Sequence, residues 1–105
     1  MFLTDDIKKS IRQKILQIGM VKKIILFGSF INGNASEDSD IDILVVKEHI
    51  DSLLREKKQI ITMLKTIDYP KDILLVDEES FEFYKKEACS VYRDAYENGE
   101  VIWTS

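Results

Sequence analysis

The chain has 105 residues, of which 45% are hydrophobic and 32% are charged, and its formal net charge is −4. This length predicts one domain, residues 1–105, and so acidic a chain is not expected to be a dedicated nucleic-acid-binding protein. The single cysteine, Cys89, excludes an internal disulfide and fits a cytoplasmic setting, and no apolar run is long enough to span a membrane.

The N-terminal segment predicts an amphipathic helix. Thr4 is a candidate N-cap, and the acidic Asp5 and Asp6 suit the first helical turn. The helix presents one apolar face, formed by Ile7, Ile11, Ile15 and Ile18. Gly19 predicts the end of the helix, because glycine commonly follows a helix C-terminus.

Two short apolar runs, residues 24–27 and 43–46, predict buried strands. Turn-forming residues bound both runs, and a polar loop separates them. If the two strands pair antiparallel, the exit of the first and the entry of the second meet at the same end of the sheet. The residues at that exit and that entry then line one mouth.

The exit carries Gly28 and Ser29, and the entry carries Asp40 and Asp42, which point to one face of the strand. Ser29 is a candidate N-cap for a short helix whose free N–H groups suit a phosphate. Two neighbouring carboxylates repel each other unless a divalent cation removes the conflict, and oxygen ligands favour Mg²⁺ or Mn²⁺. The pattern therefore predicts metal-assisted phosphoryl or nucleotidyl transfer.

Three alternatives explain this stretch less well. Solvated acids at a strand entry would account for the aspartate pair alone, but not for the whole strand, glycine-serine, gap and strand pattern. The spacing from Gly28 imitates a P-loop, although Asn34 stands where lysine is required. The acids from Asp38 imitate a calcium loop, although Ile43 replaces its turn glycine.

Residues 52–67 predict a helix, and residues 73–76 predict a third buried strand. A strand that follows a helical crossover runs parallel to its predecessor, so Asp72 enters the sheet at the same end as the aspartate pair. A third carboxylate there could bind metal and take the proton from an attacking hydroxyl. Asp68, which lies before the Tyr69-Pro70 break, and Asp77, which lies at the far end of the strand, are less suitable rivals for this role.

Residues 78–98 predict one helix or two helices with a single break. Its expected apolar face consists of Phe81, Tyr84, Ala88, Val91 and Ala95. Gly99 predicts the helix end, after which residues 101–103 close against the core. The predicted fold is therefore of the α/β (α+β) class, with a three-stranded mixed sheet flanked by about four helices.

Several side chains that could serve a ligand are better explained by packing or exposure. His49, the only histidine, is interpreted as a surface-loop residue. Tyr92, Tyr96 and Trp103 could stack on a base, but core packing is the simpler explanation. Cys89 is interpreted as a small core residue on a helix.

Gly28-Ser29, followed after ten residues by Asp40-Ile41-Asp42, resembles the signature of the DNA polymerase β-like nucleotidyltransferase superfamily. In its small size the chain resembles the minimal nucleotidyltransferase (MNT) branch of this superfamily, and the resemblance covers nearly the whole chain. It implies the polymerase β-like nucleotidyltransferase fold. It also implies that Gly28 and Ser29 contact the nucleotide together with Asp40 and Asp42.

By the same resemblance, Asp72 matches the third carboxylate of the family, so that Asp40, Asp42 and Asp72 are implied as both catalytic residues and metal ligands. Relatives often carry Ala-Arg-Gly after a Gly-Ser-x step, whereas the corresponding stretch here is Ile31-Asn32-Gly33, so Asn32 stands at the arginine position. If that arginine holds phosphate, its absence predicts weaker binding of the nucleotide donor.

The resemblance implies an enzyme that transfers AMP from ATP to a hydroxyl acceptor. It implies two Mg²⁺ ions as cofactors, with Mn²⁺ as a possible substitute. The implied acceptor is a HEPN-domain toxin encoded by an adjacent gene, with this chain as its antitoxin. Two alternatives remain open: an antitoxin that neutralises its partner by contact alone, and a domain that senses nucleotide without turnover. Homo-oligomerisation also remains open.

Overall fold

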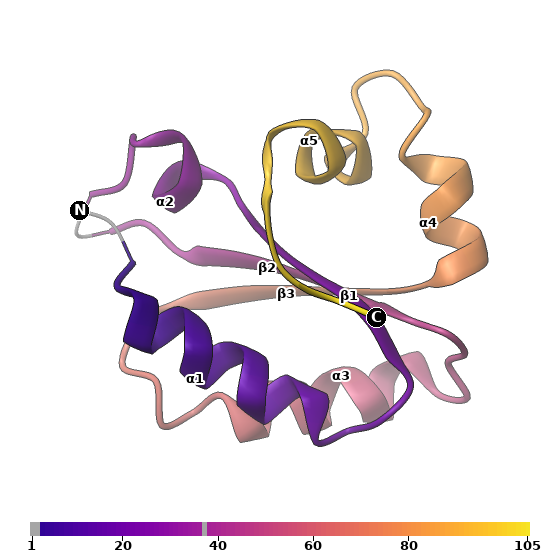
Figure 1. Ribbon diagram of the computed structural model, residues 1–105, viewed down its shortest axis with the longest axis horizontal. Helices are drawn as coiled ribbons and strands as arrows, with labels where there is room; N and C mark the ends of the chain where they lie inside the picture. Colours follow the sequence, from indigo (N-terminus) through magenta and orange to yellow (C-terminus); the bar gives the residue numbers. More distant parts are fainter. Residues whose placement is uncertain (1–2, 37) are drawn as a thin grey trace.

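The computed structural model describes residues 3–36 and 38–105. Its elements are, in chain order, α1 (Asp5–Leu16), β1 (Val21–Phe27), α2 (Ser29–Asn32), β2 (Ile41–Lys47), α3 (Leu53–Met63), β3 (Lys71–Asp77), α4 (Glu78–Tyr84), α5 (Val91–Asn98) and β4 (Glu100–Thr104). The four strands form one sheet, with α1 and α3 on one side of it and α4 and α5 on the other (Figure 1).

The strand order across the sheet is β3-β2-β1-β4. As the sequence predicts, β1 and β2 are antiparallel and β2 and β3 are parallel. The prediction of only three strands is corrected by β4, which pairs antiparallel with β1 and contains residues 101–103. Its sequence signal is weak because β4 is a short edge strand, whose contribution to the core is limited to Ile102 and Trp103.

Alternate residues of the strands face the two helical layers, as the pleat of a sheet requires. One core cluster lies on the side of α1 and α3 and includes Ile43 and Ile73. The other lies on the side of α4 and α5 and includes Leu44 and Val76. By this alternation, the even-numbered positions of β2 and β3, and therefore their first acids, face the layer of α4 and α5.

The helix α1 begins as predicted. The Thr4 side chain accepts a hydrogen bond of 3.2 Å from Ile7 N–H, and such an N-cap stabilises a helix by about 1 kcal/mol. Ile11 and Ile15 are buried, which confirms the apolar face. Gly19, with φ +79°, turns the chain into β1. Neither α1 nor any other helix in the described ranges has the length and apolar character to cross a membrane.

The region of residues 78–98 contains the break that the sequence left open, between α4 and α5. Cys89 lies in that break at φ +63° and is exposed, so its interpretation as a core residue on a helix is wrong. The predicted apolar face is correct only for Phe81 and Ala95, which are buried. The intervening turn resets the helical phase and leaves exposed Tyr84, Ala88 and Val91.

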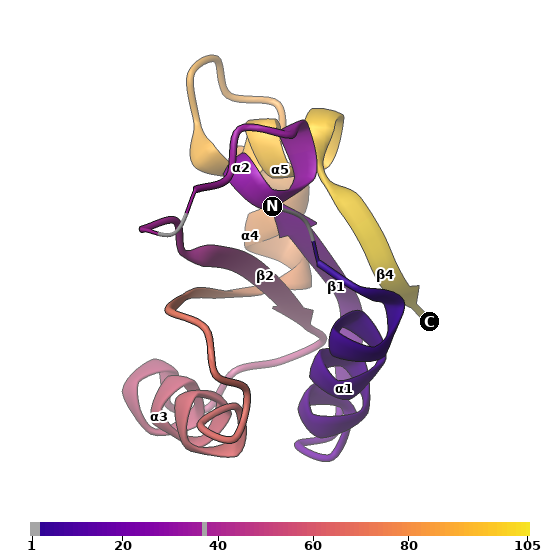
Figure 2. The same cartoon turned by 90° about the vertical axis from the view of Figure 1, so that its left-hand side faces the viewer.

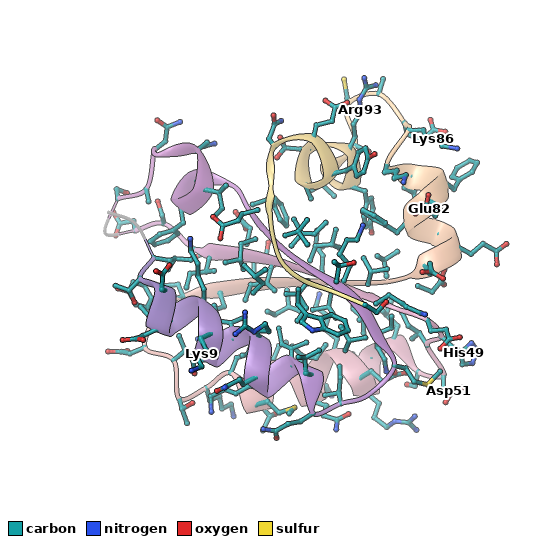
Figure 3. The ribbon with its side chains drawn as sticks, in the orientation of Figure 1. Lys9, His49, Asp51, Glu82, Lys86 and Arg93 are labelled. Carbon is teal, nitrogen blue, oxygen red and sulfur yellow. The ribbon has the colours of Figure 1, made fainter. Side chains whose placement is uncertain are left out.

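A buried ion pair joins the end of β2 to α3. Lys47 Nζ donates to Glu56 Oε1, and Glu56 Oε2 accepts from the N–H groups of Asp51 and Ser52 at 2.9 and 2.8 Å. Beside it, His49 and Asp51 lie together at the surface with their side chains 2.8 Å apart (Figure 3). The interpretation of His49 as a surface-loop residue is confirmed.

Candidate active site

Three residues on neighbouring strands form a row across one end of the sheet. Asp42 of β2 is the register partner of Phe27 in β1 and of Asp72 in β3. Strands in a sheet lie about 4.8 Å apart, so the backbones that carry the two aspartates are adjacent. Asp72 thus enters the sheet beside Asp42, at the end where the sequence places it.

Gly28 brings the backbone of the β1 exit against the carboxylate of this row. A Cβ atom added at Gly28 would lie 2.0 Å from Asp42 Oδ2 and 3.0 Å from Asp42 Cγ. The backbone at Gly28 also has φ +79°, which L side chains rarely adopt. Position 28 therefore requires glycine for two reasons: the positive φ of the turn, and the space that the Asp42 carboxylate occupies.

The helix α2 begins one residue earlier than predicted. Gly28 is its N-cap, since the carbonyl oxygen of Gly28 accepts from the N–H groups of Ile31 and Asn32, both at 3.0 Å. Ser29 is the first helical residue, so its prediction as the N-cap is wrong. The positive φ needed to leave β1 is available to glycine and not to serine. Figure 2 shows α2 at the end of the sheet, and its buried Phe30 belongs to the core cluster on the side of α1 and α3.

The carboxylates make this end of the sheet electrostatically unfavourable. Burial raises the pKa of Asp42, and the negative charges of Asp72, Asp40 and Asp94 raise it further. Asp40 and Asp72 are exposed, and Asp94 lies on α5. The sequence reasoning missed Asp94, because only the packing of α5 on the sheet brings it near β2.

The aspartates do not form a complete metal centre by themselves. In the described ranges, no three His, Cys, Asp or Glu side chains are arranged to hold a metal ion. Mg²⁺ nevertheless often takes only one or two carboxylates and completes its shell with substrate phosphates and water. A pair of neighbouring carboxylates in which burial and repulsion raise one pKa fits that kind of binding, because a cation relieves the repulsion.

The rival aspartates lie elsewhere. Asp77 is the last residue of β3. Its side chain accepts a hydrogen bond of 2.7 Å from Ser80 N–H and caps α4. Asp68 is exposed in the loop before β3, where it lines a pocket of about 690 Å³ beside α3. Ile61 and Ile73 in its lining belong to the opposite side of the sheet from Asp42, but Asp72 also lines it, so the pocket borders the row of carboxylates at the β3 edge.

The aromatic side chains contribute to packing rather than to the mouth. Tyr92 packs on the core beside α4, where it stacks on Tyr84, and Trp103 packs on the core from β4. The core-packing interpretation is wrong for Tyr96, which is 51% exposed. The centroid of its ring lies 4.5 Å from Lys85 Nζ. Phe30 of α2 is buried and meets Tyr69 edge to face.

Residues 5–102 match the family described as Nucleotidyltransferase domain. The chain belongs to this family. It is 37% identical over 86 residues to MJ0604 of Methanocaldococcus jannaschii, covering 81% of each chain. It is 48% identical over 48 residues to the protein adenylyltransferase MntA of Thermococcus cleftensis, covering 46% of this chain and 44% of that one.

Solved structures share the fold. A chain of a toxin–antitoxin complex with AMP-PNP superposes with a TM-score of 0.67 at 22% identity, covering 93% of this chain and 73% of that one. A chain of the Shewanella oneidensis complex of a tri-AMPylated HEPN toxin with MNT antitoxin gives 0.60 at 19% identity, covering 97% and 74%. The family match and the 37% identity to MJ0604, which is named a protein adenylyltransferase, confirm the predicted nucleotidyltransferase family and enzyme class, and the solved structures confirm the fold.

Proposed function

We propose that this nucleotidyltransferase acts in the cytoplasm and transfers AMP from ATP to a hydroxyl group of a HEPN-domain partner protein, for which it is the antitoxin. The observation that carries the proposal is the row in which Asp42 and Asp72 stand side by side, with the Asp42 carboxylate against Gly28. An acidic pair beside a glycine-serine turn suits a reaction between a polyphosphate and a hydroxyl group.

In this proposal the triphosphate lies at Gly28 and Ser29, where the chain leaves β1 and where Gly28 has no Cβ. Asp40, Asp42 and Asp72 would hold two Mg²⁺ ions, or Mn²⁺ in their place. These ions would supply the positive charge that neutralises the phosphates. The raised pKa of Asp42 supports this assignment, because a cation would relieve the repulsion that raises it. Asn32 contributes no positive charge at the end of α2.

The transfer step needs a base and a line of attack. The acceptor hydroxyl gives its proton to Asp72, and its oxygen forms a bond to the α-phosphorus of ATP. The bond between the α-phosphorus and the bridging oxygen of pyrophosphate breaks, so the products are an adenylylated acceptor and pyrophosphate. Asp72 suits the role of base because it is exposed on the outermost strand, where an acceptor can approach.

The identity of the acceptor is supported by the relatives. One of them is named a protein adenylyltransferase, and a chain of similar fold belongs to a complex with an AMPylated HEPN toxin. The described residues devote nearly all of their secondary structure to one sheet and its covering helices, which is consistent with an acceptor hydroxyl carried by a separate protein. A protein encoded beside this chain is the natural candidate.

A second candidate function is neutralisation of the partner by contact alone. One observation favours it: Asn32 stands where the family resemblance implies an arginine, so the end of α2 lacks that positive charge for a phosphate. A third candidate, a nucleotide sensor, would bind ATP without turnover. Both retain the fold and discard the transfer step.

One experiment separates the three functions. The protein is incubated with Mg²⁺, ATP labelled on its α-phosphate, and the purified HEPN-domain protein encoded next to it. We expect label on the partner and release of pyrophosphate, both abolished by Asp42→Asn and retained by Asp51→Asn, which alters an exposed aspartate remote from the row. A stable complex without label supports the contact antitoxin, and ATP binding without either supports the sensor. Full transfer by Asp42→Asn would refute the assigned site.

A further inference from the structure

The outer edge of β3 is open in the described part of the chain. β3 is the last strand of the sheet and pairs only with β2. Ile41 N–H donates to Pro70 C=O at 2.8 Å, and main-chain groups alternate direction along a parallel ladder. The groups of Asp72 therefore point toward β2, while those of Ile73 and Leu75 point outward, where an added strand could pair with them.

A pocket runs beneath the beginning of this edge. Its volume is about 690 Å³, and its lining includes Ile61 from α3, Ile73 from β3, and the cationic side chains Lys57 and Lys65. Ile61 is 42% exposed, so an apolar wall faces the solvent there. In Figure 2 the segment that leads from α3 into β3 lies at the opposite edge of the sheet from β4.

The pocket is preformed by a bonded loop. Lys71 Nζ donates to the carbonyl oxygens of Ile67 and Tyr69, both at 2.7 Å. Burial lowers the pKa of Lys71, which is consistent with an amine enclosed by its own loop. These bonds hold residues 67–71 as one wall of the pocket, directly before the open edge.

The other edge of the sheet does not offer this combination. β4 borders β1, and its register with β1 shifts between Ile24 and Ile25. Its first residue, Glu100, is held by Lys8 at 2.9 Å. An irregular edge with an engaged charge is a poor template for an added strand. β4 is also separated from Asp72 by two strands.

We propose that the β3 edge is the docking track for the acceptor, which binds as an extended segment added beside Ile73 and Leu75. Side chains of an extended segment alternate between the two faces of a sheet. A hydroxyl-bearing residue level with Asp72 would lie on the carboxylate face, and its neighbour in the segment would enter the pocket against Ile61. The acceptor is thus an extended peptide with a hydroxyl residue next to a large apolar residue, and acidic flanks suit Lys57 and Lys65. This inference rests on the proposed function.

Hydrogen exchange measures the docking directly. We expect the outward N–H groups of Ile73 and Leu75 to exchange at least about tenfold more slowly when the HEPN-domain protein is bound, because main-chain pairing closes them off from water. The N–H groups of β4 serve as the internal control and keep their rates. A complex in which Ile73 and Leu75 exchange as in the free protein would overturn the proposal.

Variants on one helix test the pocket. Ile61→Glu places a charge in the apolar wall, whereas Leu54→Glu changes a 67% exposed leucine of α3 that does not line the pocket. Loss of an apolar anchor should raise the KM for the protein acceptor about tenfold or more in Ile61→Glu, without a comparable rise for Leu54→Glu. Equal KM values for the two variants would contradict the docking track.

The two readouts separate failure of the docking track from failure of the proposed function. Transfer that depends on Asp42 but ignores Ile61 and leaves the β3 edge unprotected would remove the track and preserve the function. Protection of Ile73 and Leu75 without any transfer would preserve the track and remove the catalytic function. Absence of any complex would contradict both.

Discussion

Replacing Gly28 by alanine tests the contact on which the site depends. The new Cβ would lie 2.0 Å from Asp42 Oδ2, so the carboxylate would have to move by on the order of 1 Å, and such a displacement of a catalytic group reduces rates about a hundredfold. The backbone at φ +79° and ψ −156° lies in a region that is essentially restricted to glycine, so alanine there adds strain of about 1–3 kcal/mol. For a domain of this size, that strain lowers the Tm by roughly 4–24 °C.

Gly19→Ala is the matched control. Gly19 has the same φ of +79°, but a Cβ there has nothing within 4 Å. Thermal denaturation should show a loss of stability in both variants, whereas assays of AMP transfer at a temperature where both are folded should show the hundredfold loss only in Gly28→Ala. Full activity in Gly28→Ala, or equal loss in the two variants, would refute the reasoning about Asp42.

Three further predictions concern stability. Burial and neighbouring carboxylates raise the pKa of Asp42 above its unfolded value, so the stability that the protonated form contributes is lost as the pH rises through the folded-state pKa. Asp42→Asn should therefore raise the Tm at pH 7, and it should remove the increase in Tm that we expect Mg²⁺ to give the unaltered protein in thermal scans. Lys47→Met should cost about 3–5 kcal/mol in urea unfolding, because it leaves the Glu56 carboxylate buried without its cation. The hydrogen bond from Lys47 lowers the pKa of Glu56, so the unaltered protein loses this contribution as the pH falls through the folded-state pKa of Glu56, a step that an acid titration of Lys47→Met should lack. Cys89→Gly should raise the Tm slightly or leave it unchanged, since glycine relieves a φ of +63° at an exposed turn.

Local patterns in the sequence are sufficient for the centre of the fold. The apolar runs that become β1, β2 and β3 are buried on both faces, so they read as continuous apolar segments. The crossover rule then places Asp72 at the same end of the sheet as Asp42, and the structure adds the register that makes the two residues neighbours. These features were predictable because they depend on the residues of one segment or on the handedness of one connection.

The features that were missed depend on contacts between distant segments. Asp94 reaches the site only because α5 packs over the sheet, and its own segment carries no mark of that role. The helical spacing of its neighbours predicts Cys89 on a helix, yet the turn between α4 and α5 interrupts that spacing. The sequence predicts the start of α2 one residue too late because serine is the commoner N-cap, whereas the turn after β1 requires a positive φ at Gly28.

The contact between Gly28 and Asp42 explains why the glycine-serine step and the aspartate pair belong to one pattern although ten residues and a loop separate them. Antiparallel pairing makes Phe27 and Asp42 neighbours, which places Gly28 directly over the carboxylate. Any residue with a Cβ would push Asp42 away, and any register shift would bring a different side chain to Gly28. Gly28 and Asp42 therefore constrain each other through the pairing of β1 with β2. This contact explains why a glycine at the β1 exit and an aspartate at the β2 entry occur together in the sequence.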